Sequence, residues 1–295
     1  MRGKPLPMGG TIGICAPSHI AKREEYQPKI EALGRLGFKV VEADNLYKAT
    51  YGYLASPMER GADFNQLVRD PQVELILFGG GEGSNELLPY IDFGAVKENP
   101  KRILSYSDAT TILDAVWAKT GLEVYYGQSP EVFQNQTDYD RRQFFDHIVG
   151  CGTNTHAKAS PWVTLRAGGA EGVLVGGYLR NFAMQLQSPF FPVDRARKYI
   201  LFLEDNIRFG DEAYVSAMLT HIELSGFMGC VNGLLFGHYD TKPHQYLYDR
   251  LARLGGRYGI PVACCDDFGH GGNHAILEIG RNCAFETRTG SLIYD

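Results

Sequence analysis

The first half of the chain alternates short apolar segments with segments of helical periodicity. Apolar runs stand at residues 11–18, 38–44 and 73–81, and helical spacing is found at residues 24–37 and 56–70. The second helical segment opens with Ser-Pro-x-Glu, the pattern of a capped helix start. Apolar strands that alternate with helices indicate a parallel sheet with helices on both faces. The sequence therefore predicts an α/β fold.

A further unit of this half, residues 102–121, joins an apolar run to a helical pattern through a turn centred on Ser107. Small residues, Ser105 and Ala109, stand two positions either side of it. This is the layout of a nucleophile elbow, which presents a serine hydroxyl at the positive end of the following helix. The flanking residues are usually glycine, so the match is incomplete. The alternative is a plain helix N-cap formed by Ser107 or Asp108.

The glycine-rich segment GGGEGSN, residues 79–85, also follows a predicted strand. Ligands bind beyond the carboxyl ends of the strands in parallel sheets, so this segment and Ser107 are expected to converge on one site. The segment lacks the GK[ST] ending of a phosphate-binding P-loop. Its exposed backbone N–H groups would suit an oxyanion hole beside Ser107, and a simple strand-to-helix turn is the alternative.

Polar, irregular sequence at residues 131–170 interrupts this pattern, which then restarts as a mixture of strands and helices. Strands are expected at 172–177, 198–205, 231–240 and 261–280, and helices at 179–187, 211–226 and 245–259. We therefore expect an N-terminal domain of residues 1–150 with the parallel sheet, a connection at 151–169, and a smaller mixed α/β domain at 170–295.

A nucleophilic serine needs a base, and the base needs an orienting carboxylate. Glu204 closes an apolar strand, which would hold its carboxylate rigidly, although solvation of a strand end is the simpler role for Glu204 or Asp205. His270 lies in the segment FGHGGNH, whose glycines allow close approach of other groups, and His274 is the alternative base. The order Ser107, Glu204, His270 is the order of α/β-hydrolase triads.

The charge balance argues against several classes of partner. The 29 Lys and Arg against 34 Asp and Glu give a net charge of −5, so no basic face is expected for nucleic acid or an anionic membrane. No apolar run approaches the ~20 residues of a membrane span, and no apolar stretch of signal-peptide length precedes Pro5 and Pro7. We expect a cytoplasmic protein. Its six cysteines, Cys151 among them, show no CxxC spacing and are expected to be free thiols.

A metal site would have to be assembled from Asp266, Asp267, His270 and His274. Two histidines four residues apart share a helix face, but the two glycines between these histidines disfavour a helix. No metal is therefore expected.

Several segments together resemble the LD-carboxypeptidase family of serine peptidases, which includes muropeptide LD-carboxypeptidases and microcin C self-immunity peptidases. The resemblance covers nearly the whole chain in the same order. It is carried by GYLAS at 52–56, the run 57–93, YSDAT at 106–110, ILFLED at 200–205, AMLTHI at 217–222 and FGHGGNHAILEIG at 268–280.

The resemblance implies a flavodoxin/Rossmann-like, amidotransferase-like parallel-sheet domain followed by a C-terminal mixed α/β domain of swivelling type. It implies Ser107 as nucleophile, His270 as general base and Glu204 as orienting acid, with no metal or other cofactor. The implied oxyanion hole consists of the backbone N–H groups of Gly80, Gly81 and Asp108. It also implies an active site between the domains, often in a homodimer.

Five further residues are expected to contact substrate: Glu82, Ser84 and Asn85 in the glycine-rich segment, with Gln128 and Tyr178. Gln128 stands where the family usually has proline and Tyr178 where it usually has asparagine. These two departures leave the choice of substrate open.

The expected function is that of a serine carboxypeptidase that hydrolyses an LD-peptide bond and releases terminal D-Ala from murein tetrapeptide. The alternative substrate is an aminoacyl-nucleotide conjugate, as in microcin immunity peptidases. Trp162 would then be a stacking surface, although an anchoring role in a connection is the simpler interpretation. An alternative of another class is a small-molecule binding protein without catalysis.

Overall fold

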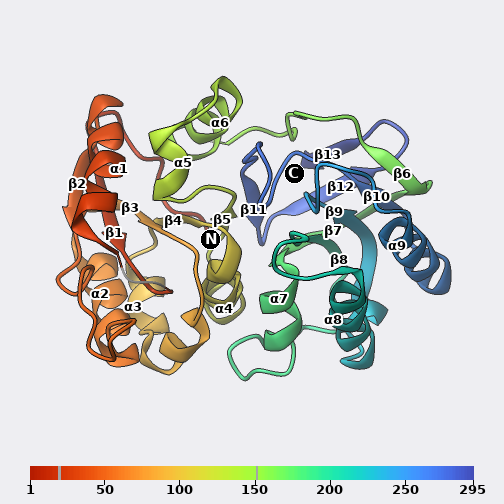
Figure 1. The fold of residues 1–295 in the computed structure, drawn as a ribbon, viewed down its shortest axis with the longest axis horizontal. Coiled ribbons are helices and arrows are strands. Elements are labelled where there is room, and N and C mark those ends of the chain that lie inside the picture. The colour runs from red at the N-terminus through yellow and green to blue at the C-terminus, as the bar shows by residue number, and fades with distance from the viewer. Residues whose placement is uncertain (19–20, 151) are drawn as a thin grey trace. The chain divides into compact units, whose positions relative to one another are not determined.

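The computed structural model describes residues 1–18, 21–150 and 152–295, which form two compact units (Figure 1). The first unit spans Met1–Gly152 and the second spans Thr153–Asp295. Most of the expected connection therefore belongs to the second unit, where Val163–Arg166 forms a strand, β6. Cys151, the first residue of that connection, lies outside the described residues.

The first unit is built on a parallel sheet, as predicted. Its strands lie in the order β5 (Val124–Tyr126), β4 (Arg102–Ser105), β3 (Val73–Phe78), β1 (Thr11–Cys15) and β2 (Lys39–Glu42), each parallel to its neighbour. Every strand but β2 is almost fully buried, as expected of parallel strands that are covered on both faces.

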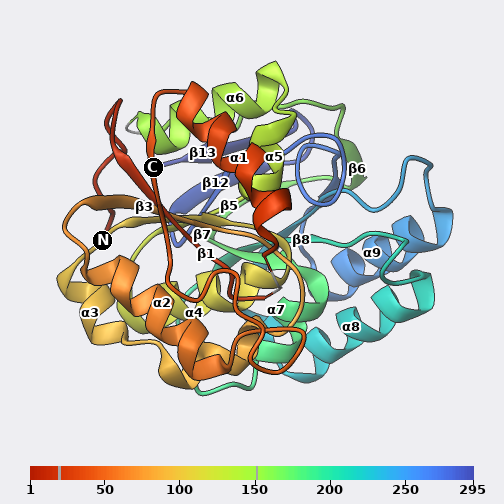
Figure 2. The same cartoon turned by 60° about the vertical axis from the view of Figure 1, so that its left-hand side comes forward.

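Helices follow the strands of this unit along the chain. They are α1 (Arg23–Arg35), α2 (Pro57–Arg69), α3 (Phe93–Glu98), α4 (Thr110–Thr120), α5 (Pro130–Gln134) and α6 (Asp138–Phe144), with short turns η1 (Ser84–Tyr90), η2 (Ser107–Ala109) and η3 (Phe145–Val149). The predicted cap of α2 is confirmed, since the Glu59 N–H donates to Ser56 Oγ and the Ser56 N–H to the Glu59 carboxylate. In Figure 2, α2 lies beside α3.

The expectation of irregular structure from residue 131 onward is wrong for α5, α6 and η3. A capping box begins α6: the Asp140 N–H donates to Thr137 Oγ1, and the Thr137 N–H to the Asp140 carboxylate. The acidic residue at the third helical position was visible in the sequence, but the polar composition masked the short helix behind it.

The second unit contains a mixed sheet. The strand order is β13 (Ser291–Tyr294), β12 (Asn282–Glu286), β7 (Gly169–Tyr178), β8 (Tyr199–Glu204), β9 (Val231–Phe236), β10 (Val262–Cys264) and β6. The central strands β7 to β10 are parallel, and β6, β12 and β13 pair antiparallel at the two edges. Helices α7 (Leu179–Gln185), α8 (Glu212–Leu224) and α9 (Gln245–Tyr258) join the parallel strands, and α8 and α9 lie side by side (Figures 1 and 2).

The expectation of a single strand at 261–280 is wrong. The chain forms β10, leaves the sheet for the segment 265–276, and then forms a separate short strand, β11 (Leu277–Ile279). The apolar residues at both ends suggested continuity, but the acidic and glycine-rich middle cannot sustain a buried strand. His270 therefore sits in a loop at the carboxyl end of β10.

Among the described residues, no helix combines the length and apolarity needed to cross a membrane.

Glycine is required near the carboxyl end of β7, where this strand pairs with β8. Gly176 has φ +138°, and a Cβ built on it would lie 1.8 Å from the carbonyl oxygen of Phe202 on β8. Residues with a side chain rarely adopt such a backbone conformation, and here the backbone of β8 also fills the space that a Cβ would need. The close approach of β7 and β8 thus depends on this residue.

Gly176→Ala is expected to lower the free energy of unfolding by at least about 3 kcal/mol, because overpacking and positive-φ strain add. Gly256→Ala in α9 is the matched control, since nothing lies within 4 Å of the Cβ it would add. That variant is expected to gain about 0.5–1 kcal/mol from helix propensity. Urea denaturation of both variants tests this, and equal stability of the two would contradict it.

Candidate active site

Ser107 occupies a strained turn at the carboxyl end of β4. Its φ is +64°, and it is the only residue other than glycine with a positive φ in the part of the chain that the structure describes. The left-handed conformation costs a side-chain-bearing residue roughly 1–2 kcal/mol. The Thr110 hydroxyl donates to the Ser107 carbonyl at 2.7 Å, and the Ser107 N–H donates to the Tyr126 hydroxyl at 3.1 Å. These bonds hold the turn that a nucleophile elbow requires.

The N-cap alternative for this serine is not supported. The residue at the N-cap of α4 is Ala109, which makes no side-chain capping bond. The Ser107 side chain is 8% exposed, and the Asp108 carboxylate is engaged elsewhere, accepting the Ser84 N–H at 2.8 Å.

Ser105, which replaces the usual glycine of the elbow, fits without displacing the strand. Its side chain is fully buried, and its hydroxyl donates to the carbonyl oxygen of Phe78 on β3 at 2.5 Å. The extra hydroxymethyl group therefore links the ends of two neighbouring strands.

The glycine-rich segment after β3 approaches the serine closely. A Cβ on Gly80 would lie 2.8 Å from Ser107 Cβ and 3.1 Å from Ser107 Oγ, so only glycine fits there. The next residue, Gly81, is exposed with φ +130°, and its N–H makes no hydrogen bond among the described residues. The Glu82 N–H instead donates to the Ser18 carbonyl at 3.0 Å. Gly81 thus offers an exposed donor beside the serine.

Buried polar contacts hold this segment in place. Besides the bond from its N–H to Asp108, Ser84 donates its hydroxyl to the Asp108 carbonyl at 2.7 Å. The buried Arg60 guanidinium donates to the Gly83 carbonyl at 3.0 Å and also to the Pro17 carbonyl. The loops after β1, β3 and β4 are therefore fixed by shared side chains.

The residues expected to contact substrate in this unit differ in accessibility. Glu82 and Asn85 are exposed, whereas Ser84 is fully buried against Asp108. Gln128 is also fully buried, and its side-chain N–H donates to the Asp140 carbonyl at 2.8 Å. Ser84 and Gln128 therefore support the fold of the first unit.

In the second unit, Glu204 and His270 form a direct pair. Glu204 ends β8 and is fully buried, and its Oε2 lies 2.8 Å from His270 Nδ1 and accepts the His270 backbone N–H at 3.2 Å. Because a carboxylate only accepts hydrogen bonds, Nδ1 carries the hydrogen, and Nε2 is the basic nitrogen of the neutral ring. A Cβ on Gly269, whose φ is +103°, would lie 2.7 Å from Glu204 Oε2. The glycine before His270 thus permits the contact.

The charges around His270 set its pKa. Burial lowers the pKa of His270, but the charge and hydrogen bond of Glu204, with the charge of Asp205, raise it above its ordinary value of 6.5. Arg180 opposes them. Burial also raises the pKa of Asp205 to about 7, and the Oδ2 of this fully buried side chain has no hydrogen-bond partner among the described residues.

Two aromatic rings flank the imidazole. The centroid of Tyr178 lies 5.1 Å and that of Phe209 5.2 Å from the centroid of the His270 ring. Tyr178 is buried, so it supports the histidine, while Phe209 is 56% exposed. Sequence reasoning missed Phe209, because an isolated phenylalanine in a loop carries no periodic signal.

Three of the four candidate metal ligands, Asp266, Asp267 and His270, each make hydrogen bonds to a different partner. Asp267 is fully buried and accepts hydrogen bonds from the Nε2 of His156, the N–H of Ala159, the N–H and hydroxyl of Ser160 and the Nε1–H of Trp162, at 2.6–3.0 Å. Asp266 contacts His238, and His270 contacts Glu204. No group of three or more potential ligands capable of holding a metal occurs among the described residues. Trp162 serves as the anchor in its segment.

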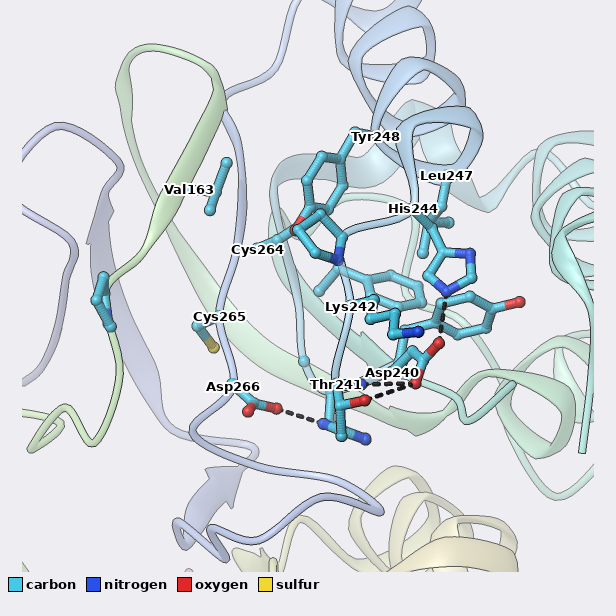
Figure 3. Close-up of a pocket in the computed structure, with 16 residues that line it drawn as sticks. Val163, Asp240, Thr241, Lys242, His244, Leu247, Tyr248, Cys264, Cys265 and Asp266 are labelled. Atoms are coloured by element: carbon cyan, nitrogen blue, oxygen red, sulfur yellow. Dashed lines mark hydrogen bonds and ion pairs between the residues drawn. The ribbon is translucent and has the colours of Figure 1, made fainter. Parts of the chain in front are cut away.

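A separate cavity of about 170 Å³ lies at the carboxyl ends of β9 and β10, and none of the predicted site residues lines it (Figure 3). At its edge, His244 places Nδ1 2.6 Å from Glu212 and Nε2 2.7 Å from Asp240. Hydrogen bonds to both carboxylates raise the pKa of His244 and favour its charged form. Cys264 and Cys265 on its wall are free, as are Cys15, Cys230 and Cys283.

The strain at Ser107 predicts an unusual order of stability. Ser107→Gly removes the Cβ that disfavours positive φ, whereas Ser107→Ala keeps it. The glycine variant is expected to unfold with a free energy about 1 kcal/mol higher than the alanine variant, the reverse of the order in a helix. Chemical denaturation measures this difference. An alanine variant as stable as the glycine variant would show that the turn stores no strain.

Comparison with known proteins places these two units in one family. Residues 12–127 match the LD-carboxypeptidase N-terminal domain (Peptidase_S66), and residues 171–285 match the LD-carboxypeptidase C-terminal domain (Peptidase_S66C). The probable murein peptide carboxypeptidase of Bacillus subtilis is 31% identical over 241 residues, covering 79% of this chain and 73% of that protein.

A second relative is the microcin C7 self-immunity protein MccF of Escherichia coli, 39% identical over 127 residues, which are 42% of this chain and 37% of that protein. A solved structure of MccF in complex with glutamyl sulfamoyl guanosine has the same fold, with a TM-score of 0.88 at 24% identity over 99% of this chain and 98% of that chain. The chain therefore belongs to the LD-carboxypeptidase family of serine-type peptidases.

Proposed function

We propose that this protein is a serine carboxypeptidase in which Ser107 is the nucleophile, His270 the general base and Glu204 the orienting acid. The observation that carries the proposal is the left-handed backbone of Ser107, because strain held at a serine at a strand end is typical of a nucleophile elbow. The Glu204–His270 pair supplies the other two roles. It favours His270 over His274 as the base.

The proposed reaction gives each of these three residues one role. The mechanism requires His270 Nε2 to reach the Ser107 hydroxyl and take its proton while Oγ bonds to the carbonyl carbon. The imidazolium then gives this proton to the leaving amine nitrogen, and the C–N bond breaks. Water hydrolyses the acyl-enzyme by the same proton transfers. Glu204 keeps Nδ1 protonated and stabilises the imidazolium.

The developing oxyanion needs backbone donors, and we propose Gly80, Gly81 and Asp108 for this role. The exposed Gly81 N–H, with no other bond among the described residues, is the best supported of the three. Each such donor typically contributes 10²–10³-fold to kcat, or about 3 kcal/mol. The Ser107 N–H is already bonded to the Tyr126 hydroxyl.

The first candidate substrate is a murein tetrapeptide, from which terminal D-Ala would be released. It is supported by the relative named as a murein peptide carboxypeptidase, which matches most of this chain. The second candidate is an aminoacyl-nucleotide conjugate, supported by the similarity to MccF and by the sulfamoyl nucleotide in the MccF complex. A binding protein without catalysis would have no use for the strained serine.

Purified protein should therefore be incubated separately with murein tetrapeptide and with an aminoacyl sulfamoyl adenosine. Release of D-Ala that Ser107→Ala abolishes is the expected result. Turnover of only the nucleotide conjugate would assign the second substrate. Turnover of neither, or turnover that survives in Ser107→Ala, would overturn the proposed function.

The pH profile tests the roles of the two carboxylates beside His270. Catalysis needs the neutral imidazole, so kcat/KM is expected to fall as the pH drops through a pKa above 6.5. Glu204→Gln removes the charge that raises this pKa, so the acid limb should move to lower pH. A loss of kcat of up to about 10⁴-fold is expected, because the neutral amide no longer stabilises the imidazolium and its N–H₂ can donate to Nδ1, which favours the wrong tautomer.

Asp205→Asn is the matched control, because it removes a neighbouring charge and leaves the bond to Nδ1 intact. Its acid limb should also move to lower pH, but kcat above the limb should stay within a few-fold of the parent value. A Glu204→Gln enzyme that keeps the parent kcat would contradict the role of Glu204.

A homodimer in the cytoplasm, expected from the sequence, stays a prediction. Gel filtration with light scattering of the full chain measures its oligomeric state.

A further inference from the structure

We propose that Phe209 forms the apolar wall of the leaving-group subsite, and that it selects leaving groups with an apolar or planar face beside the scissile bond. This inference rests on the proposed role of His270 as the base. It assigns a specificity role to a residue that neither the fold nor the predicted triad requires.

The first observation is the exposure of a large apolar ring beside the imidazole. Phe209 is 56% exposed, yet its ring stands edge-to-face against His270, with 5.2 Å between the centroids and 68° between the planes. The centroid of the Phe209 ring also lies 6.5 Å from that of the Tyr178 ring. Tyr178 covers the histidine from a buried position, so Phe209 is the flanking ring that keeps open surface.

The second observation is that this ring sits on a fixed turn. The Phe209 N–H donates to the Asn206 carbonyl at 2.8 Å, and the Arg208 N–H to the Asn206 side-chain oxygen at 3.0 Å. The Asn206 side-chain N–H in turn donates to the His270 carbonyl at 3.1 Å. The Ile207 N–H donates to the Tyr239 backbone carbonyl at 3.0 Å. The backbone that carries Phe209 is thus tied to the backbone of His270, and the two rings keep their spacing.

The chemistry of acyl transfer places the leaving group next to this ring. Glu204 occupies His270 Nδ1, so Nε2 is the nitrogen that protonates the departing amine. The amine must therefore lie within hydrogen-bond distance of Nε2, beside the rings that flank the imidazole. A substituent on that amine meets the exposed face of Phe209.

An exposed phenyl ring discriminates by apolar contact. The methyl group of a D-Ala leaving group would bury apolar surface against it, worth about fourfold in kcat/KM relative to glycine at ~0.8 kcal/mol per carbon. A planar base or nucleoside would stack on the ring, with an effect of tenfold or more. Both leaving groups share the required chemistry, and the experiment distinguishes them.

The test compares Phe209→Ala and Phe209→Leu with Tyr246→Ala, a control that removes another exposed aromatic ring of the second unit. Substrates are the murein tetrapeptide, its analogue ending in glycine, and an aminoacyl sulfamoyl adenosine. Phe209→Ala is expected to abolish the about fourfold preference for D-Ala over glycine, chiefly through KM. Phe209→Leu should retain part of it, and Tyr246→Ala all of it. If the nucleotide conjugate is the true substrate, its kcat/KM should fall tenfold or more in Phe209→Ala.

An equal loss of kcat on every substrate, with unchanged preference, would show that Phe209 only positions His270 and would overturn the proposal. A binding measurement keeps the test independent of turnover. Calorimetry with Ser107→Ala protein, with and without Phe209→Ala, measures the affinity for the three uncleaved substrates. Equal affinities in both proteins would overturn the specificity role even if the parent enzyme is active. If the unmodified enzyme turns over none of the three substrates, the proposed function is overturned, whatever the binding measurements show.

Discussion

The buried contact between Glu204 and His270 is the interaction on which the second unit is organised. A fully buried carboxylate is costly unless hydrogen bonds satisfy it, and this one accepts both the backbone N–H and the ring N–H of the same residue. The parallel strands bring the end of β8 next to the loop after β10, and Gly269 removes the side chain that would keep them apart. The fold thus supplies the close approach, and the carboxylate fixes the histidine within it.

In the first unit, the corresponding feature is the strained backbone of Ser107. This serine stands in a left-handed turn, and bonds from Thr110 and to Tyr126 help to hold that turn. The glycine-rich segment reaches it because Gly80 has no side chain. In both units a glycine allows one segment to approach another closely, and the residue proposed for catalysis lies beyond the carboxyl end of a strand.

Much of this arrangement could be predicted from sequence because it depends on local patterns. Apolar runs predicted the strands, and the Ser56–Glu59 pair predicted the start of α2. The strand–turn–helix layout with small flanking residues singled out Ser107, and glycine context singled out His270. The strand expected through residues 265–276 was wrong, because apolar ends concealed a loop whose bonds come from distant residues. Phe209 and the partners of Asp267 could not be found, since their contacts join segments remote in the chain. The roles of the triad stay predictions.

The five hydrogen bonds to Asp267 have a consequence for how sequence changes combine in this protein. The Asp267 carboxylate ties residues 156–162 to the loop that carries His270, which stands three positions after Asp267. Groups that share one buried acceptor do not act independently, so the effects of substitutions at His156, Ser160 and Trp162 should not add. Sequence drift in a segment that looks like a plain connection is thereby coupled to the histidine loop, and the two stretches are expected to vary together.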